Sequence, residues 1–160
     1  MEKEVLKAMN EHINLEIYSG YLYLTMSIQM EKYNYKGFSK WLLDHSKEEL
    51  SHAEDFISYL QKRNVSATLY DIKADSIDKK EPLDIAKLVL KHEAKVTSQI
   101  YELHDIAKKN NDYATEVFMH KYINEQIEEE DLAQTIIDKF TFAGDSTAAK
   151  YSVDKELFNL

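Results

Sequence analysis

The stretch Lys47-Glu48-Glu49-Leu50-Ser51-His52 restricts the fold more than any other part of the sequence. It lies in residues 36–63, which contain no proline and repeat their apolar residues at three- and four-residue spacing, as an amphipathic helix does. On such a helix Glu49 and His52, at positions i and i+3, project from the apolar face. A carboxylate and an imidazole are therefore expected in the core, where ionisable groups need partners.

Three further segments, residues 2–33, 83–110 and 113–142, show the same apolar spacing without a proline in the interior. The 160 residues include only three glycines and one proline, and Asn, Asp, Gly and Ser gather between the periodic segments. The sequence therefore predicts an all-α fold with four long helices and a short fifth helix at residues 148–158. Pro82 is tolerated in the first turn of a helix, so the third helix is expected to begin there.

Residues 64–81 have no helical period, although connections longer than about 12 to 15 residues are uncommon in compact domains. Eighteen extended residues cover about 60 Å, whereas a helix of 28 residues is about 42 Å long. The segment is long enough to run the length of the bundle. We expect two helical hairpins joined by one long crossover, in a single domain that spans residues 1–160.

The polar residues of the predicted core repeat along the chain. Glu16 precedes Glu49 by 33 residues (49 − 16) and His52 by 36 (52 − 16). The second hairpin repeats both spacings with its own polar residues, Glu93, Gln126 and Glu129. Because corresponding groups lie at similar distances from their turns, all six are expected at one level of the bundle.

This cluster predicts a metal site, because buried carboxylates without a cation would cost several kcal/mol each or would have to bind protons. A Glu-x-x-His pair, combined with a Glu from the first helix of each hairpin, is the pattern of a carboxylate-bridged two-metal centre. The second hairpin carries Gln126 where the first carries Glu49, so the Gln126 side is expected to be the weaker position. The chain has no cysteine, and oxygen ligands with one imidazole favour iron over zinc, with manganese as an alternative.

Further candidate residues flank this pattern. Glu48, Glu125 and Glu128 form an acidic group that is predicted to hold an additional ion, with an ordinary solvated face as the alternative. Tyr23, two helical turns from Glu16, is a candidate for supplying an electron or a hydrogen bond to bound oxygen, and packing in the core is the alternative.

The formal net charge of −9 argues against a nucleic-acid-binding or membrane-binding surface and suits a protein that handles cations. No stretch approaches the roughly 20 apolar residues of a membrane span, and the N-terminus lacks a secretion signal. A soluble, cytoplasmic protein is expected.

Several motifs together resemble those of the prokaryotic-type non-haem ferritins. They are N-L-E (14–16), Tyr23, E-E-L-S-H (48–52), K-H-E (91–93) and N-E-Q-I-E-E-E (124–130). The likeness extends over nearly the whole chain and implies the ferritin-like four-helix bundle.

The resemblance also implies a function. It implies ferroxidase activity that oxidises Fe(II) with O2 or H2O2, two or three iron ions per subunit, and storage of a ferric mineral in a homo-oligomeric cage of 24 subunits. It assigns the first iron position to Glu16, Glu49 and His52. It assigns the second to Glu49, Glu93 and Glu129, with Gln126 nearby. A third site would use Glu48, Glu125, Glu128 and Glu129.

Some residues depart from the family's pattern or have no assigned role. Glu116 matches one of two acidic residues that line the threefold channel of animal ferritins, but Met119 occupies the other position. No haem is expected, because methionines on an apolar helix face usually serve packing. The remaining histidines are interpreted as structural or surface residues: His12, His45, His92, His104 and His120.

Other functions remain as alternatives. A DNA-protecting mini-ferritin would be expected to have a basic tail, which the charge of −9 opposes. A di-iron peroxide reductase would need an electron-donor site, and the absence of cysteine excludes a rubredoxin-like domain in this chain. A non-catalytic helical interaction protein would leave the buried carboxylates unexplained.

Overall fold

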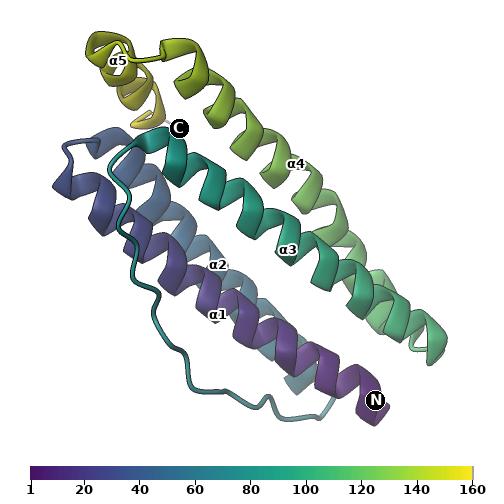
Figure 1. The fold of residues 1–160 in the computed structure, drawn as a ribbon. Helices are drawn as coiled ribbons and strands as arrows, with labels where there is room; N and C mark the ends of the chain where they lie inside the picture. Colours follow the sequence, from purple (N-terminus) through teal and green to yellow (C-terminus); the bar gives the residue numbers. More distant parts are fainter. Residues whose placement is uncertain (160) are drawn as a thin grey trace.

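The computed structural model describes residues 1–159, which form five helices and contain no strand (Figure 1). The helices are α1 (Lys3–Lys32), α2 (Lys36–Lys62), α3 (Pro82–Lys109), α4 (Tyr113–Ala143) and α5 (Thr147–Leu157). The predicted all-α fold is confirmed, and each of the four long helices begins and ends within a residue or so of the predicted bounds. Within the described residues, no helix is both long and apolar enough to cross a membrane.

Asparagines end the first three helices. Asn34, Asn64 and Asn111 have φ values of 64°, 55° and 53°, in the left-handed region that Asn tolerates better than most residues. After α1, the N–H of Tyr35 donates to the carbonyl of Met30 at 3.0 Å, which satisfies a carbonyl in the last turn of the helix. The equivalent bond follows α2 and α3.

The connection between α2 and α3 runs the length of the bundle beside α1 (Figure 1). Side chains of α1 hold its backbone. Asn10 Oδ1 accepts from the N–H of Thr68 at 2.7 Å, and Gln29 Nε2, near the other end of α1, donates to the carbonyl of Lys79 at 2.8 Å. The predicted crossover is therefore confirmed, and several of its backbone polar groups find partners on the helix that it follows.

Two apolar clusters fill the bundle, one toward each end. One contains Met26 and Phe38, near the turn between α1 and α2, and the other contains Met9 and Phe56, near the opposite end. On each long helix a polar segment separates the residues of one cluster from those of the other. The core is thus apolar at both ends and polar in a layer at the middle.

Helix α5 packs across the end of the bundle at the start of α2. The buried carboxylate of Asp154 accepts from the backbone N–H groups of Gly37 and Phe38 at 3.0 and 2.8 Å. A Cβ atom on Gly37 would lie 1.7 Å from the carbonyl oxygen of Asp154, so this close approach requires glycine.

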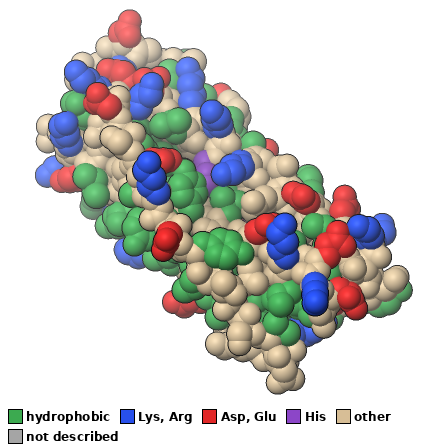
Figure 2. Space-filling view, turned by 60° about the horizontal axis from the view of Figure 1, so that its bottom comes forward, with side chains coloured by type: hydrophobic (Ala, Val, Ile, Leu, Met, Phe, Trp, Pro, Cys, Tyr) green, Lys and Arg blue, Asp and Glu red, His purple; other side chains and the backbone are tan. Residues whose placement is uncertain are grey.

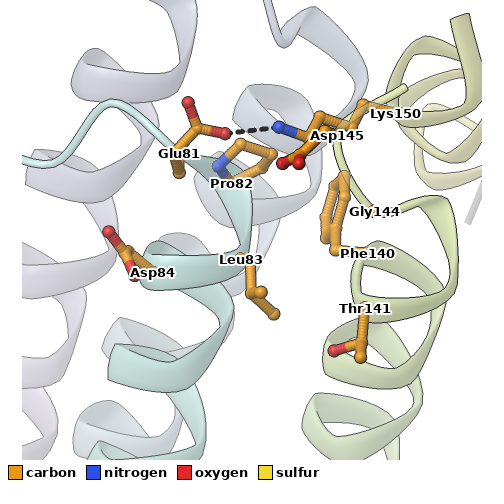
Figure 3. Close-up of a pocket in the computed structure, with 9 residues that line it drawn as sticks. All are labelled: Glu81, Pro82, Leu83, Asp84, Phe140, Thr141, Gly144, Asp145 and Lys150. Atoms are coloured by element: carbon orange, nitrogen blue, oxygen red, sulfur yellow. Dashed lines mark hydrogen bonds and ion pairs between the residues drawn. The ribbon is translucent and has the colours of Figure 1, made fainter. Parts of the chain in front are cut away.

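A cavity of about 440 Å³ opens at the same end of the molecule, between the start of α3 and the end of α4 (Figure 3). The Nζ of Lys150, on α5, lies 2.6 Å from a carboxylate oxygen of Glu81, at its rim. The apolar part of the cavity lining comes from Pro82, Leu83 and Phe140. This cavity lies away from the polar layer, and its lining holds none of the metal-ligand clusters found among residues 1–159.

Candidate metal centre

The polar layer brings together the six residues with repeated spacing, and every long helix contributes to it. They are Glu16 on α1, Glu49 and His52 on α2, Glu93 on α3, and Gln126 and Glu129 on α4. Glu16 and Glu93 are each only 1% exposed, so their carboxylates are removed from bulk water.

Glu16, Glu49 and His52 form a compact group. One ligand atom from each lies within 4.8 Å of the others, with His52 Nδ1 at 3.6 Å from Glu49 Oε2. Glu16 Oε2 is buried and has no hydrogen-bond partner among the described residues. An unpartnered buried carboxylate oxygen facing an imidazole and a second carboxylate fits the donor set of a divalent cation.

The other side of the layer is organised around Glu93, whose two oxygens both accept hydrogen bonds. The Tyr23 hydroxyl donates to Oε1 at 2.6 Å, and Gln126 Nε2 donates to Oε2 at 3.1 Å. Across from this pair, Glu129 Oε2 lies 3.7 Å from His45 Nε2. Glu93 is thus restrained by two neutral donors, whereas Glu16 is not.

A third group adjoins the first through His52. Glu48, His52 and Glu125 also offer ligand atoms within 4.8 Å of one another, with His52 Nε2 at 3.2 Å from Glu125 Oε1. The imidazole therefore faces Glu49 with one nitrogen and Glu125 with the other. Glu128 is exposed and does not enter this group in the described part of the chain, so the structure brings together only part of the predicted acidic cluster.

Comparison with known proteins identifies the family. Residues 6–143 match the Ferritin-like domain. The chain is 33% identical over 157 residues to the bacterial non-heme ferritin of Staphylococcus aureus (strain USA300), with 98% of this chain and 95% of that protein covered. It is 34% identical to the bacterial non-heme ferritin of Staphylococcus epidermidis over the same shares of the two chains.

The chain belongs to the ferritin family.

Solved structures agree with this assignment. An open pore ferritin from the archaeon Archaeoglobus fulgidus superposes with a TM-score of 0.96 at 35% identity, over 99% of this chain and 97% of that one. A form of the same ferritin engineered to be closed also gives 0.96, at 36% identity, over 99% and 96% of the two chains. The ferritin-like bundle is therefore the fold of this chain, and membership places it among proteins that bind and store iron and in general oxidise Fe(II).

Burial sets the electrostatics of the ferritin centre. Burial raises the pKa of Glu16 and of Glu93 to about 7 and the pKa of Glu49 and of Glu129 to about 8, against ordinary values near 4.5. Neighbouring carboxylates add to the shift for Glu93 and Glu129. Without a cation, these four carboxyl groups therefore retain protons to a higher pH than ordinary glutamates do.

The pKa of His52 is raised, which favours the positively charged imidazolium that offsets the charge of the neighbouring carboxylates. Burial alone would lower its pKa, but the nearby carboxylates of Glu125, Glu49 and Glu16 raise it to about 11. The bond from His52 in turn lowers the pKa of Glu125. In the metal-free protein, the positive charge of the His52 imidazolium and the protons on the carboxyl groups offset the negative charge that a metal ion would otherwise neutralise. Metal binding must therefore displace protons.

The buried residue His12 was interpreted from sequence as structural or surface, yet it adjoins the centre. Its Nε2 lies 2.7 Å from Glu16 Oε1, one helical turn along α1, without the alignment of a hydrogen bond. Burial lowers the pKa of His12 to about 4, so the ring is neutral near pH 7. In the sequence, the i, i+4 spacing of His12 and Glu16 is the only indication that His12 lies near the centre. It is a weak indication, because most such pairs on helices only pack together.

The remaining residues with sequence predictions are placed as follows. Met119 is fully buried in an apolar cluster, so of the two positions compared with the channel of animal ferritins only Glu116 reaches the surface. The His45 ring packs against Trp41 with ring centroids 3.7 Å apart and an interplanar angle of 31°, and His92 Nε2 lies 2.7 Å from the Ser19 hydroxyl. Both imidazoles thus contact other side chains in the bundle, and a purely structural role for them stays a prediction.

Proposed function

We propose that this ferritin chain is a ferroxidase that oxidises Fe(II) at a two-iron centre in the middle of the bundle. The buried and unpartnered Glu16 carboxylate oxygen, beside Glu49 and His52, is the observation that carries the proposal. Its ionised form is unfavourable in an apolar bundle unless a cation binds. Iron is the substrate, and manganese would meet the same oxygen-rich ligands.

The proposed roles follow the two halves of the layer. The first iron binds Glu16, Glu49 and His52. The second binds Glu49, Glu93 and Glu129, with Gln126 beside it, and Glu49 bridges the pair. Gln126, a neutral amide that donates to Glu93, stands in the second half where the first half has the Glu49 carboxylate, so the second position is weaker and fills after the first.

The chemistry is a two-electron transfer. Each Fe(II) loses one electron and becomes Fe(III), and O2 accepts the two electrons with two protons to form H2O2. If H2O2 is the oxidant, its O–O bond breaks and two electrons with two protons give two molecules of water. Apolar clusters pack on both sides of the layer, and the carboxylates neutralise the extra charge of Fe(III).

Glu48 and Glu125 are proposed to hold a third iron next to His52, in transit or as a source of a further electron. Glu128 and Glu129 complete this site in the form that the family resemblance implies. Since Glu128 is exposed, its side chain would have to turn inward when the ion binds.

We further propose that residues 1–160 act as one domain and assemble into a homo-oligomeric cage of 24 subunits that stores ferric mineral without haem, in the cytoplasm. Exposed apolar side chains support assembly: Tyr21, Leu24 and Ile28 are 48%, 39% and 65% exposed and lie on one side of α1. In a space-filling view, hydrophobic side chains also reach the surface between charged groups of both signs (Figure 2). Subunit contacts would remove such surface from water.

The decisive experiment mixes metal-free protein with Fe(II) in air at increasing iron per chain and follows oxidation by rapid absorbance. We expect fast oxidation that saturates near two or three irons per chain and is lost in Glu49→Ala/His52→Ala. The control is Glu54→Ala, which removes an exposed carboxylate from α2 outside the three groups and should oxidise iron like the wild type. Oxidation no faster than in buffer would overturn the proposal.

A further inference from the structure

The imidazole of His12 lies against a carboxylate of the candidate metal centre, but the reaction proposed above does not use it. His12 is 1% exposed, and its Nε2 lies 2.7 Å from Glu16 Oε1, one turn further along α1. Within residues 1–159, neither ring nitrogen of His12 makes an aligned hydrogen bond, and Glu16 Oε2 makes none either. Polar atoms buried this deeply are nearly always paired in folded proteins, so this group of atoms needs an explanation.

Two other helices contact the His12 ring and hold it in place. The ring packs against Phe56 of α2, with the two ring centroids 4.6 Å apart. The side chain of Gln99, on α3, lies close enough to raise the pKa of His12, and its buried Oε1 has no hydrogen-bond partner among the described residues. A neutral imidazole donates through one nitrogen and accepts through the other, so the ring is able to join Gln99 to Glu16.

His12 is not placed to bind the same ion as Glu16. Glu16, Glu49 and His52 offer ligand atoms within 4.8 Å of one another, and no such group among residues 1–159 includes His12. The His12 nitrogen lies beside Oε1 of Glu16, whereas Oε2 is the oxygen without a partner. This is the geometry of a residue that holds one oxygen of a ligand carboxylate while the other oxygen binds the metal.

The internal repeat places this arrangement in the first hairpin alone. An offset of 77 residues relates Glu16 to Glu93 (93 − 16), and the same offset relates His12 to Val89 (89 − 12). Val89 is buried and its side chain offers no polar group. Glu93 instead accepts a hydrogen bond from the Tyr23 hydroxyl at 2.6 Å. The two corresponding carboxylates therefore have different neighbours, and the neighbour of Glu16 is His12.

We propose that His12 is a positioning residue of the first iron position, which donates through Nε2–H to Glu16 Oε1 and so directs Oε2 to the metal ion. The inference rests on the proposed two-iron centre, because it assigns a role within that centre. A small rotation of the ring about its Cβ–Cγ bond, a torsion that is broad in histidine, aligns the N–H with the carboxylate. The bond strengthens when the carboxylate is ionised, as it is when it binds metal.

A neutral donor suits this role. Burial keeps the His12 ring uncharged near pH 7, so it holds the carboxylate without repelling a cation bound to the other oxygen. A lysine in the same place would add a positive charge beside the ion. The hydrogen bond also restricts the rotation of the Glu16 side chain, so less conformational freedom is lost when the ion binds.

The test measures metal affinity rather than turnover. Metal-free assembled protein is titrated with Co²⁺, and the part of the visible spectrum that Glu49→Ala/His52→Ala removes reports binding at the centre. We expect His12→Phe to weaken this component by about 10- to 100-fold, because the phenyl ring fills the space but donates no hydrogen bond. His12→Gln, which restores an N–H donor, should recover most of the affinity.

The control is His92→Phe, which makes the same replacement at another buried imidazole. The partner of His92 is the Ser19 hydroxyl rather than a carboxylate of the centre, so this variant should bind Co²⁺ as the wild type does. Iron oxidation adds a second readout. In His12→Phe the Fe(II) concentration that gives half the maximal rate should rise, while the maximal rate stays close to that of the wild type, because His12 does not touch the iron.

The outcomes separate this inference from the ferroxidase proposal. If the wild type lacks the Co²⁺ component that Glu49→Ala/His52→Ala removes, the centre itself is overturned, and the role of His12 with it. If the component is present and His12→Phe binds Co²⁺ as tightly as the wild type, only the role of His12 is overturned. Equal losses in His12→Phe and His12→Gln would also overturn it, because a hydrogen bond would then not be the cause.

Circular dichroism of each variant verifies that its helices remain folded. If His12→Phe unfolds, Gln99→Leu tests the same chain of contacts from the other side of the ring. Loss of the amide frees the imidazole to turn away from Glu16, so the Co²⁺ component should weaken, and an unchanged affinity in Gln99→Leu would count against the role of His12.

Discussion

At the scale of single residues, the hydrogen bonds of Glu93 distinguish the two halves of the centre. Tyr23 is fully buried and donates to Glu93 at 2.6 Å, while burial raises its own pKa well above 10, so the hydroxyl keeps its proton. Gln126 restrains the other oxygen. These two donors hold in place a carboxylate that would otherwise lack a partner in the metal-free protein.

Tyr23→Phe should therefore act on both stability and kinetics. Loss of a buried hydrogen bond to a carboxyl group should lower the free energy of unfolding by about 1–3 kcal/mol, and the less restrained Glu93 should slow iron oxidation. Chemical denaturation and rapid-mixing absorbance measure the two effects. Tyr18→Phe is the control, because Tyr18 bonds to Asp75 at the surface of the same helix. Oxidation at the wild-type rate in Tyr23→Phe would remove any role for this hydroxyl in the reaction.

Gln126→Glu should have opposite effects with and without metal. The new carboxylate replaces a donor to Glu93 and adds a buried negative charge, so the metal-free protein should lose about 1–3 kcal/mol of stability. With a divalent ion bound, the added ligand should strengthen the second position. Thermal unfolding with chelator and with Zn²⁺ measures both, and a Zn²⁺-induced rise in Tm no larger than that of the wild type would contradict the expected role of Gln126.

At the scale of helices, the sequence was sufficient for most of the architecture. Apolar periodicity and the asparagine turns located the long helices to within a residue or so, because long amphipathic helices carry strong local signals. The repeated spacing also identified the six residues of the polar layer. The structure also brings ligand atoms of His104, Glu116 and His120 within 4.8 Å of one another, which the sequence did not predict.

Other features depend on contacts that periodicity does not encode. The proximity of His12 to Glu16 requires knowledge of which rotamers the packed bundle permits. The exposure of Glu128 likewise depends on how α4 is rotated about its own axis. The interaction of Asp154 with the start of α2 joins residues more than 100 positions apart, and no local pattern predicts it.

The contact between Asp154 and the start of α2 predicts how firmly α5 is held on the bundle. In Gly37→Ala the new Cβ would clash with the backbone carbonyl of Asp154 at 1.7 Å, so α5 must move and both backbone bonds to the Asp154 carboxylate weaken. Loss of a cap of this kind costs about 1–2 kcal/mol. We expect faster proteolysis within residues 147–157, with Ser152→Ala on the exposed side of α5 as the control. Resistance equal to that of the wild type would show that this contact does not hold α5 in place.

At the scale of the whole molecule, two apolar clusters enclose a layer of buried carboxyl groups with raised pKa values. Raised carboxyl pKa values mean that the folded chain keeps protons that the unfolded chain, with ordinary values near 4.5, releases. The proton retained by His52 acts in the same direction above about pH 6.5. Metal-free folding is therefore favoured at lower pH, whereas metal binding, which needs ionised ligands, is favoured at higher pH.

Between pH 6.5 and 8, the free energy of unfolding of the metal-free protein should therefore fall as the pH rises, on the order of a few kcal/mol. His12 and His92, whose pKa values burial lowers to about 4, act in the opposite direction only below about pH 6.5, where the unfolded imidazoles bind protons, so they leave this range unaffected. Denaturant titrations with chelator, at fixed protein concentration, measure the slope. Glu16→Gln/Glu129→Gln should flatten it, and saturating Zn²⁺ should stabilise the protein more at pH 8 than at pH 6.5. Metal-free stability that is constant or rises over this range would mean that the carboxylates are already ionised in the folded chain, and the polar layer would then need another source of positive charge.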